Sequence, residues 1–127
     1  MKLHHVALTI KDLNVSIPFY GELFGFKEIL RFRRDDMGGT GCLLQNENII
    51  IELWQFDILK EGSREDLSFT GIKHIAFTDE NPELVHKSFI EKGIKCTDIH
   101  TGASGGIYFF LSDPDENQIE IYKPPIL

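Results

Sequence analysis

The sequence lacks the features by which proteins bind nucleic acid or cross membranes. Its 127 residues carry a formal net charge of −7, and Lys and Arg gather only in the stretch RFRR at 31–34. We therefore expect no nucleic-acid partner. No apolar run approaches the length needed to span a bilayer, and the start MKLHHVALTI is too short and too rich in His for a signal-peptide core. We expect no membrane partner and a cytoplasmic location.

Cysteine is also scarce. Cys42 and Cys96 stand far apart with no second Cys near either, which excludes a disulfide framework and a four-thiolate zinc site. We expect both to be small buried hydrophobes or bystanders. The 42% hydrophobic content, with ten Phe, supplies a core without such links. The length predicts one compact unit or two tightly joined halves.

What the chain does contain is a repeat. The segment HVALT at 5–9 and the segment HIAFT at 74–78 share His, Ala and Thr at alternate positions, 69 residues apart. In a strand, alternate residues lie on one face, so the three identities share a face and the bulkier residues between them share the other. A strand face with small residues beside a His is typical of a cavity lining.

A second repeated strand carries an acidic residue. When NENIIIELW at 46–54 is laid over PDENQIEIY at 114–122, Glu52 pairs with Glu120. Each carboxylate interrupts an otherwise apolar or amphipathic strand. Each half of the chain therefore contains a His and then, some 46 or 47 residues later, a Glu.

Between the His and the Glu, both halves predict a helix followed by several strands. Pro18 fits only the first turn of a helix, which places the first N-cap near Asn14, and Gly25 ends that helix. In the second half Asn81 precedes Pro82, a typical helix start, and Gly93 ends the element. The predicted strands after the helices are 26–34, 40–46 and 48–56 in the first half, and 94–100, 107–113 and 117–123 in the second.

The candidate ligands of a metal ion are His5, Glu52, His74 and Glu120. An unpaired carboxylate on such a strand is costly unless a cation or a donor compensates it. Two imidazoles and two carboxylates suit Ni²⁺, Co²⁺, Zn²⁺, Mn²⁺ or Fe²⁺ and leave two octahedral positions for water or substrate. Taken singly, each His is more often a core residue and each Glu a solvated one. The matched repeat favours one shared site.

These motifs carry a family resemblance over essentially the whole chain. The sequence resembles the glyoxalase/bleomycin-resistance/extradiol-dioxygenase (vicinal oxygen chelate) superfamily, and within it the short bacterial glyoxalase I-like (lactoylglutathione lyase-like) proteins. The resemblance implies an α+β fold of two tandem βαβββ modules, a curled mixed sheet forming a half-barrel around a metal. The corresponding segments are HHVALTIKDLNVSIPFYGELFGF, IIIELWQF, GIKHIAFTDE and DPDENQIEIY.

The predicted organisation is one domain, 1–127. Its N-terminal module spans 1–56, a polar linker spans 57–70, and the C-terminal module spans 71–127. The resemblance implies a homodimer. The length allows either one site closed within a chain or modules exchanged between two chains.

The implied function is that of a metal-dependent lyase or isomerase, which transfers a proton alpha to a carbonyl through a metal-bound enediolate. Its substrate is a small vicinal-oxygen compound, such as a 2-oxoaldehyde thiol adduct. The resemblance assigns the base to Glu120, the opposite catalytic carboxylate to Glu52, and the remaining metal ligands to His5 and His74.

Two alternatives stay open. Thiol transferases and dioxygenases of the superfamily use two His and one carboxylate, so Glu52 argues against them, and a non-catalytic antibiotic-binding protein needs no metal. The basic residues that hold glutathione in glutathione-dependent members are missing, because Thr9 stands on the first strand and TDIHTGASGG at 97–106 has no Lys or Arg. Another thiol adduct or another vicinal-oxygen substrate is therefore open.

Several further residues allow two interpretations. TGASGG at 101–106 could wrap an anion or form a plain hairpin, and RFRR is either a solvated strand or a contact for an acidic substrate tail. The remaining three His are expected at the surface or packed on a helix, with His4 pointing away from His5 by strand alternation. Four aromatic residues either line a substrate pocket or belong to the core: Trp54, Phe56, Tyr108 and Phe110.

Overall fold

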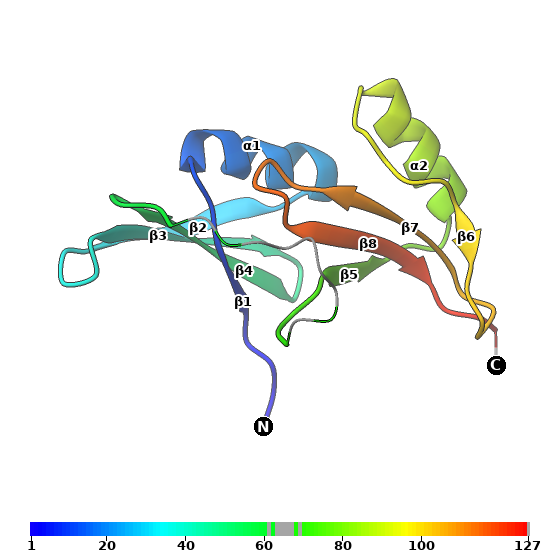
Figure 1. Cartoon of the computed structure of the whole chain (residues 1–127), viewed down its shortest axis with the longest axis horizontal. Helices are drawn as coiled ribbons and strands as arrows, with labels where there is room; N and C mark the ends of the chain where they lie inside the picture. The colour runs from blue at the N-terminus through cyan, green and yellow to red at the C-terminus, as the bar shows by residue number, and fades with distance from the viewer. Residues whose placement is uncertain (61, 63–67, 69, 127) are drawn as a thin grey trace. The chain divides into compact units, whose positions relative to one another are not determined.

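The computed structural model describes residues 1–60, 62, 68 and 70–126 (Figure 1). The chain divides into two compact units, Met1–Arg64 and Glu65–Leu127. The division falls inside the expected linker, 57–70, part of which lies outside the described residues. No helix in the described part of the chain is long and apolar enough to cross a membrane.

The first unit is a four-stranded mixed sheet with one helix (Figure 1). Strand β1 pairs with β4 in parallel, and β4, β3 and β2 follow in antiparallel order. The elements are β1 (Val6–Thr9), α1 (Leu13–Phe24), β2 (Lys27–Arg34), β3 (Gly39–Asn46) and β4 (Ile49–Phe56).

The second unit repeats this topology. Strand β5 pairs with β8 in parallel, and the sheet order β5-β8-β7-β6 matches β1-β4-β3-β2. Both units are therefore βαβββ modules, which confirms the predicted α+β fold of two tandem modules. The elements are β5 (Ile75–Thr78), α2 (Pro82–Glu91), β6 (His100–Thr101), β7 (Ile107–Ser112) and β8 (Gln118–Lys123).

Alternation along the last strand of each unit separates a helix-covered face from a second face. Ile51 and Leu53 on β4 are buried, as are Ile119 and Ile121 on β8, and α1 and α2 pack against these sheets. The residues between them, which include Glu52 and Glu120, are half-buried. We call the sheet face that carries Glu52 or Glu120 the open face of its unit.

Helix α1 begins two residues earlier than its proline suggested. Asp12 is the N-cap and accepts a hydrogen bond from the backbone N–H of Asn14 at 2.9 Å, so the expected cap at Asn14 is wrong and Pro18 lies inside the helix. Pro18 leaves the carbonyl of Asn14 without its helical donor. Both residues are exposed, so water can take that place. The predicted end at Gly25, with φ 71°, is confirmed.

The second helix begins as predicted, but the strand after it does not form as predicted. Asn81 caps α2 by accepting from the N–H of Leu84 at 3.3 Å. Of the expected strand 94–100, only an isolated bridge at Cys96 and the start of the two-residue β6 remain.

Thr97 explains the interruption of that strand. Its Oγ1 accepts from the N–H of Phe110 at 2.8 Å, while its carbonyl contacts Nε2 of His86 at 2.9 Å. A side-chain hydroxyl thus replaces the backbone carbonyl that a regular ladder would use. His86 thereby packs from α2 onto the sheet, with its ring edge-on to Phe109 at 4.9 Å.

Candidate metal site

Each unit brings its predicted His and Glu together. His5 Nε2 lies 3.8 Å from Glu52 Oε2, and His74 Nε2 lies 2.9 Å from Glu120 Oε2. The exposed fractions also match: 37% and 38% for the His side chains, 16% and 15% for the Glu side chains. Two sequences that share few residues therefore build the same nitrogen–oxygen pair twice.

The sheet register positions these pairs. Ala7 of β1 lies beside Glu52, and Ala76 of β5 lies beside Glu120, both in parallel pairing. Each His stands immediately before its strand, and its Nε2 faces a carboxylate oxygen on the neighbouring strand. Because alanine has only a methyl group, the imidazole can reach the carboxylate of the neighbouring strand.

His4 contacts His5, which corrects the expectation that it points away. Nδ1 of His4 lies 2.8 Å from Nδ1 of His5, and the two rings meet edge-on. Strand β1 begins only at Val6, so residues 4 and 5 are not held in the pleat and strand alternation does not apply to them. The contact engages Nδ1 of His5 and leaves Nε2 to face Glu52, as an outer partner of a metal-bound imidazole would.

Glu52 has a second partner that sequence reasoning missed. The indole Nε1 of Trp54 donates a hydrogen bond to Glu52 Oε1. The signal was present in the sequence, since residues two apart on a strand share a face. Glu120 has no counterpart of this bond among the described residues, where its one partner is His74.

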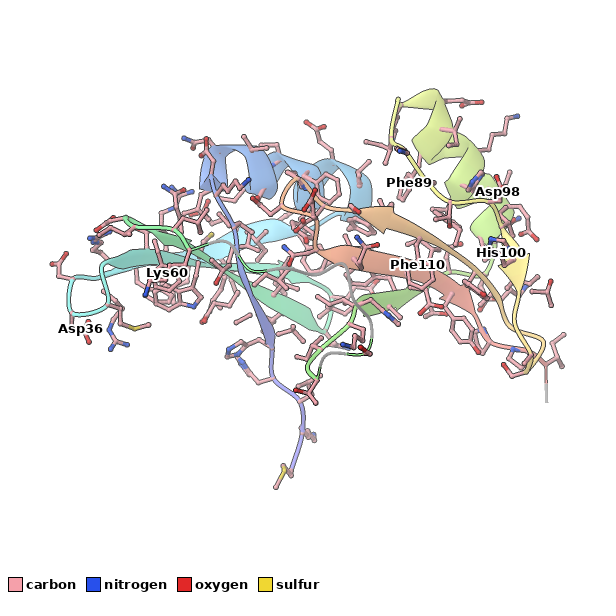
Figure 2. The ribbon with its side chains drawn as sticks, in the orientation of Figure 1. Asp36, Lys60, Phe89, Asp98, His100 and Phe110 are labelled. Atoms are coloured by element: carbon pink, nitrogen blue, oxygen red, sulfur yellow. The ribbon has the colours of Figure 1, made fainter. Side chains whose placement is uncertain are left out.

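The four aromatic residues expected either in a substrate pocket or in the core are all half-buried, so none belongs to the fully buried core: Trp54, Phe56, Tyr108 and Phe110. Trp54 stacks on Phe56 at 5.7 Å, with the ring planes 11° apart. Phe110 of β7, labelled in Figure 2, has its ring edge-on to the ring of His74, with centroids 5.3 Å apart. Aromatic surface thus adjoins the His–Glu pair in both units.

The donor chemistry fits a divalent ion, but each unit holds only half of the predicted set. No group of three or more His, Cys, Asp or Glu close enough to hold a metal occurs among the described residues. Each pair supplies one imidazole nitrogen and one carboxylate oxygen, which are donors that suit Ni²⁺, Co²⁺, Zn²⁺, Mn²⁺ or Fe²⁺. The shared four-ligand site of His5, Glu52, His74 and Glu120 remains a prediction.

The basic cluster of β2 is engaged by acidic residues of its own unit. Arg33 donates to Asp57 at 2.5 and 2.9 Å and to Asp35 at 2.9 Å, and its guanidinium holds the pKa of the Asp57 carboxyl below its usual range. The other pairs are Arg31–Glu28 and Arg34–Asp36, the latter beside the β2–β3 turn (Figure 2). A solvated, internally paired strand is the better interpretation.

The remaining candidates are structural. Burial raises the pKa of the Cys42 thiol to about 11, so near neutral pH it is a protonated thiol and not a nucleophile.

In the segment 101–106, the N–H of Gly102 donates to the carbonyl of Gly106 at 2.7 Å and the N–H of Gly105 to the carbonyl of Gly102 at 2.9 Å. Those two donors are used within a hairpin, which favours the hairpin over an anion loop.

Comparison with known sequences identifies the family. Residues 2–121 match the Glyoxalase/Bleomycin resistance protein/Dioxygenase superfamily. The chain belongs to this superfamily, as its motifs indicated.

Three curated relatives show how far the similarity extends. The chain is 32% identical to YwkD of Bacillus subtilis, covering 95% of each protein. It is 28% identical to a lactoylglutathione lyase of Escherichia coli O157:H7, covering 97% of this chain and 93% of the lyase. It is 27% identical to the metallothiol transferase FosB of Bacillus licheniformis, covering 94% of this chain and 73% of FosB.

Solved structures confirm the fold. A glyoxalase family protein from Enterococcus faecalis superposes with a TM-score of 0.85 at 24% identity, over 96% of this chain and 97% of that one. The fosfomycin resistance protein FosX of Listeria monocytogenes, solved with Mn(II) and sulfate, superposes with a TM-score of 0.71 at 20% identity, over 98% and 93%.

Proposed function

We propose that this protein is a metal-dependent lyase or isomerase of the glyoxalase I type. The observation that carries the proposal is the duplicated His–Glu pair, formed at matching register positions in both units. A single pair would be an ordinary ion pair. Two pairs in a duplicated fold, in a superfamily that includes a lactoylglutathione lyase and a metallothiol transferase, support a common metal site.

One divalent ion, of Ni, Co, Zn, Mn or Fe, would be held by His5, Glu52, His74 and Glu120. When bound, it would polarise the substrate carbonyl and stabilise the negative charge that develops on its oxygen. The two His would hold their neutral Nε2 toward the ion, and His4 supports this for His5 by occupying the other ring nitrogen.

The proton transfer is assigned to Glu120. A general base must be able to reach the proton that it removes, and one Glu120 oxygen has no partner among the described residues. The carboxylate would accept the proton from the carbon alpha to the carbonyl and return it to the adjacent carbon, which isomerises the substrate without net oxidation. Glu52 would act as the carboxylate on the opposite side of the ion.

The substrate is a small vicinal-oxygen compound such as the adduct of a 2-oxoaldehyde with a thiol. Thr9 stands exposed on the open face where a basic residue would hold glutathione, and the arginines of 31–34 are paired within their own unit. A thiol with fewer carboxylates than glutathione therefore fits these residues better. A homodimer is part of the same proposal.

A substrate screen tests the proposal. The protein, stripped with a chelator and reloaded with each of the five ions, is assayed against 2-oxoaldehyde hemithioacetals of several thiols. Acyl-CoA epimers are included because their interconversion also moves a proton alpha to a carbonyl. We expect turnover of at least one hemithioacetal with metal, and loss of that turnover both without metal and in Glu52→Ala.

Other outcomes of the same screen would overturn the proposal. Modification of an antibiotic by a thiol, or consumption of oxygen, together with inert hemithioacetals, would place the protein with the transferases or dioxygenases. Binding of an antibiotic with no bound metal would make it a sequestering protein, because such a protein gains nothing from an ion.

A further inference from the structure

The chain's one tryptophan lies on the open face of the first unit. Trp54 lies on β4, two residues after Glu52, with Gly41 of β3 as its cross-strand neighbour. A side chain at Gly41 would collide with Phe32, whose ring lies 2.4 Å from the position of the missing Cβ. The absence of that side chain lets the Phe32 ring lie over β3 and meet the indole.

Two aromatic rings fix the orientation of the indole. Phe32 meets it edge-on, with centroids 5.3 Å apart, and Phe56 stacks on it at 5.7 Å. Edge-on and stacked contacts at these distances are favourable aromatic geometries. The indole N–H is thereby directed at Glu52, to whose Oε1 it donates.

The hydrogen bond gives the two carboxylate oxygens of Glu52 different partners. Oε1 accepts from the indole, whereas Oε2 faces His5 Nε2. A carboxylate held in this way has one oxygen committed to the protein and the other presented in a fixed direction. Outer contacts of this kind orient ligands and raise metal affinity.

The described residues of the second unit contain no such hydrogen bond. The residue two after Glu120 is Tyr122, whose ring packs over Gly106, where an added Cβ would lie 2.4 Å from it. Among the described residues, no hydrogen bond joins Tyr122 to Glu120, and Glu120 is left with His74 alone. The two His–Glu pairs are therefore alike, but only Glu52 accepts an additional hydrogen bond from a neighbouring side chain among the described residues.

We infer that Trp54 is a positioning residue that makes Glu52 the permanently bound carboxylate of the site and leaves Glu120 as the one free to move. This inference rests on the proposed function. It assigns the difference between the two carboxylates to one indole N–H.

Metal affinity of matched variants tests the inference. Wild type, Trp54→Phe and Tyr122→Phe are titrated with Co²⁺ or Ni²⁺ against a competing chromophoric chelator, and the melting temperature of each metal-free protein is recorded. Trp54→Phe removes the donor and keeps an aromatic ring. We expect it to weaken metal binding about 10- to 100-fold, the usual effect of an outer-shell change, and we expect Tyr122→Phe to bind like wild type.

A second measurement does not depend on how well Trp54→Phe folds. One tryptophan gives one indole N–H signal in a ¹H–¹⁵N correlation spectrum of the metal-free protein. We expect Glu52→Gln to shift that signal, because a charged acceptor is replaced by a neutral one, and Glu120→Gln to leave it in place.

The outcomes separate the two ideas. The role of Trp54 would be overturned, while the proposed function stands, by either of two results. One is equal metal affinity in wild type and Trp54→Phe, and the other is an indole N–H signal that does not shift in Glu52→Gln. A wild-type protein that binds no metal would overturn the proposed function instead. If the indole signal of that protein still shifted in Glu52→Gln, the hydrogen bond would exist but would have no role in metal binding.

Discussion

We expect Glu120→Gln to lose most of its turnover while the fold survives. Gln has nearly the shape of Glu but cannot accept the substrate proton, and loss of a general base typically costs about 10²- to 10⁴-fold in rate. The measurement is kcat/KM of the metal-loaded variant on the substrate that the screen identifies. The melting temperature of the metal-free variant is expected to stay close to that of wild type.

Glu22→Gln is the matched control for this experiment. It makes the same chemical change on an exposed position of α1, so activity is expected to be unchanged. Undiminished activity in Glu120→Gln would remove the assignment of the base. A larger loss in Glu52→Gln than in Glu120→Gln would reverse the roles of the two carboxylates.

The second large effect is the loss of metal from single His variants. If one ion binds both units, His5→Ala and His74→Ala must each remove a quarter of its protein ligands, although the two residues belong to different units. We expect both variants to fall from about one ion per chain to nearly none after dialysis. The metal content is measured by mass spectrometry, together with the rise in melting temperature on adding the ion.

His100→Ala serves as the control, because His100 (labelled in Figure 2) is exposed on β6, the edge strand opposite β5 in the second sheet. Its metal content and melting response are expected to match wild type. If either His5→Ala or His74→Ala kept a full complement of metal, the ion would be held by one pair alone and the idea of a shared site would fail.

The sequence was informative where a repeat fixed the register. Because strand side chains alternate, aligning His5 with His74 and Glu52 with Glu120 was enough to predict which residues share a face. The structure pairs Ala7 with Glu52 and Ala76 with Glu120 accordingly. The tandem βαβββ order followed from the same alignment.

Local hydrogen bonds that override a pattern could not be predicted. The strand expected at 94–100 is interrupted because the hydroxyl of Thr97 takes the N–H of Phe110 and its carbonyl goes to His86. The start of α1 moved because Asp12 caps it despite the proline inside. In both places a side chain competes with a regular backbone bond.

The predicted site was incomplete in its outer contacts. His4 lies against His5 because β1 begins only at Val6, so neither His is held in the strand pleat. Trp54 was assigned to a pocket or to the core, whereas its N–H binds Glu52. Residue types and spacing indicate which groups can bind a metal, but the direction of a single N–H depends on the rings packed around it.

The most direct test of the shared site is a crystal structure grown with Mn²⁺, with the ion located by its anomalous scattering. For a shared site we expect one strong peak about 2 Å from Nε2 of His5, Nε2 of His74 and a carboxylate oxygen each of Glu52 and Glu120. The same peak is expected whether the two units belong to one chain or to two. A peak coordinated by only one His–Glu pair, or by other residues, would contradict the shared site.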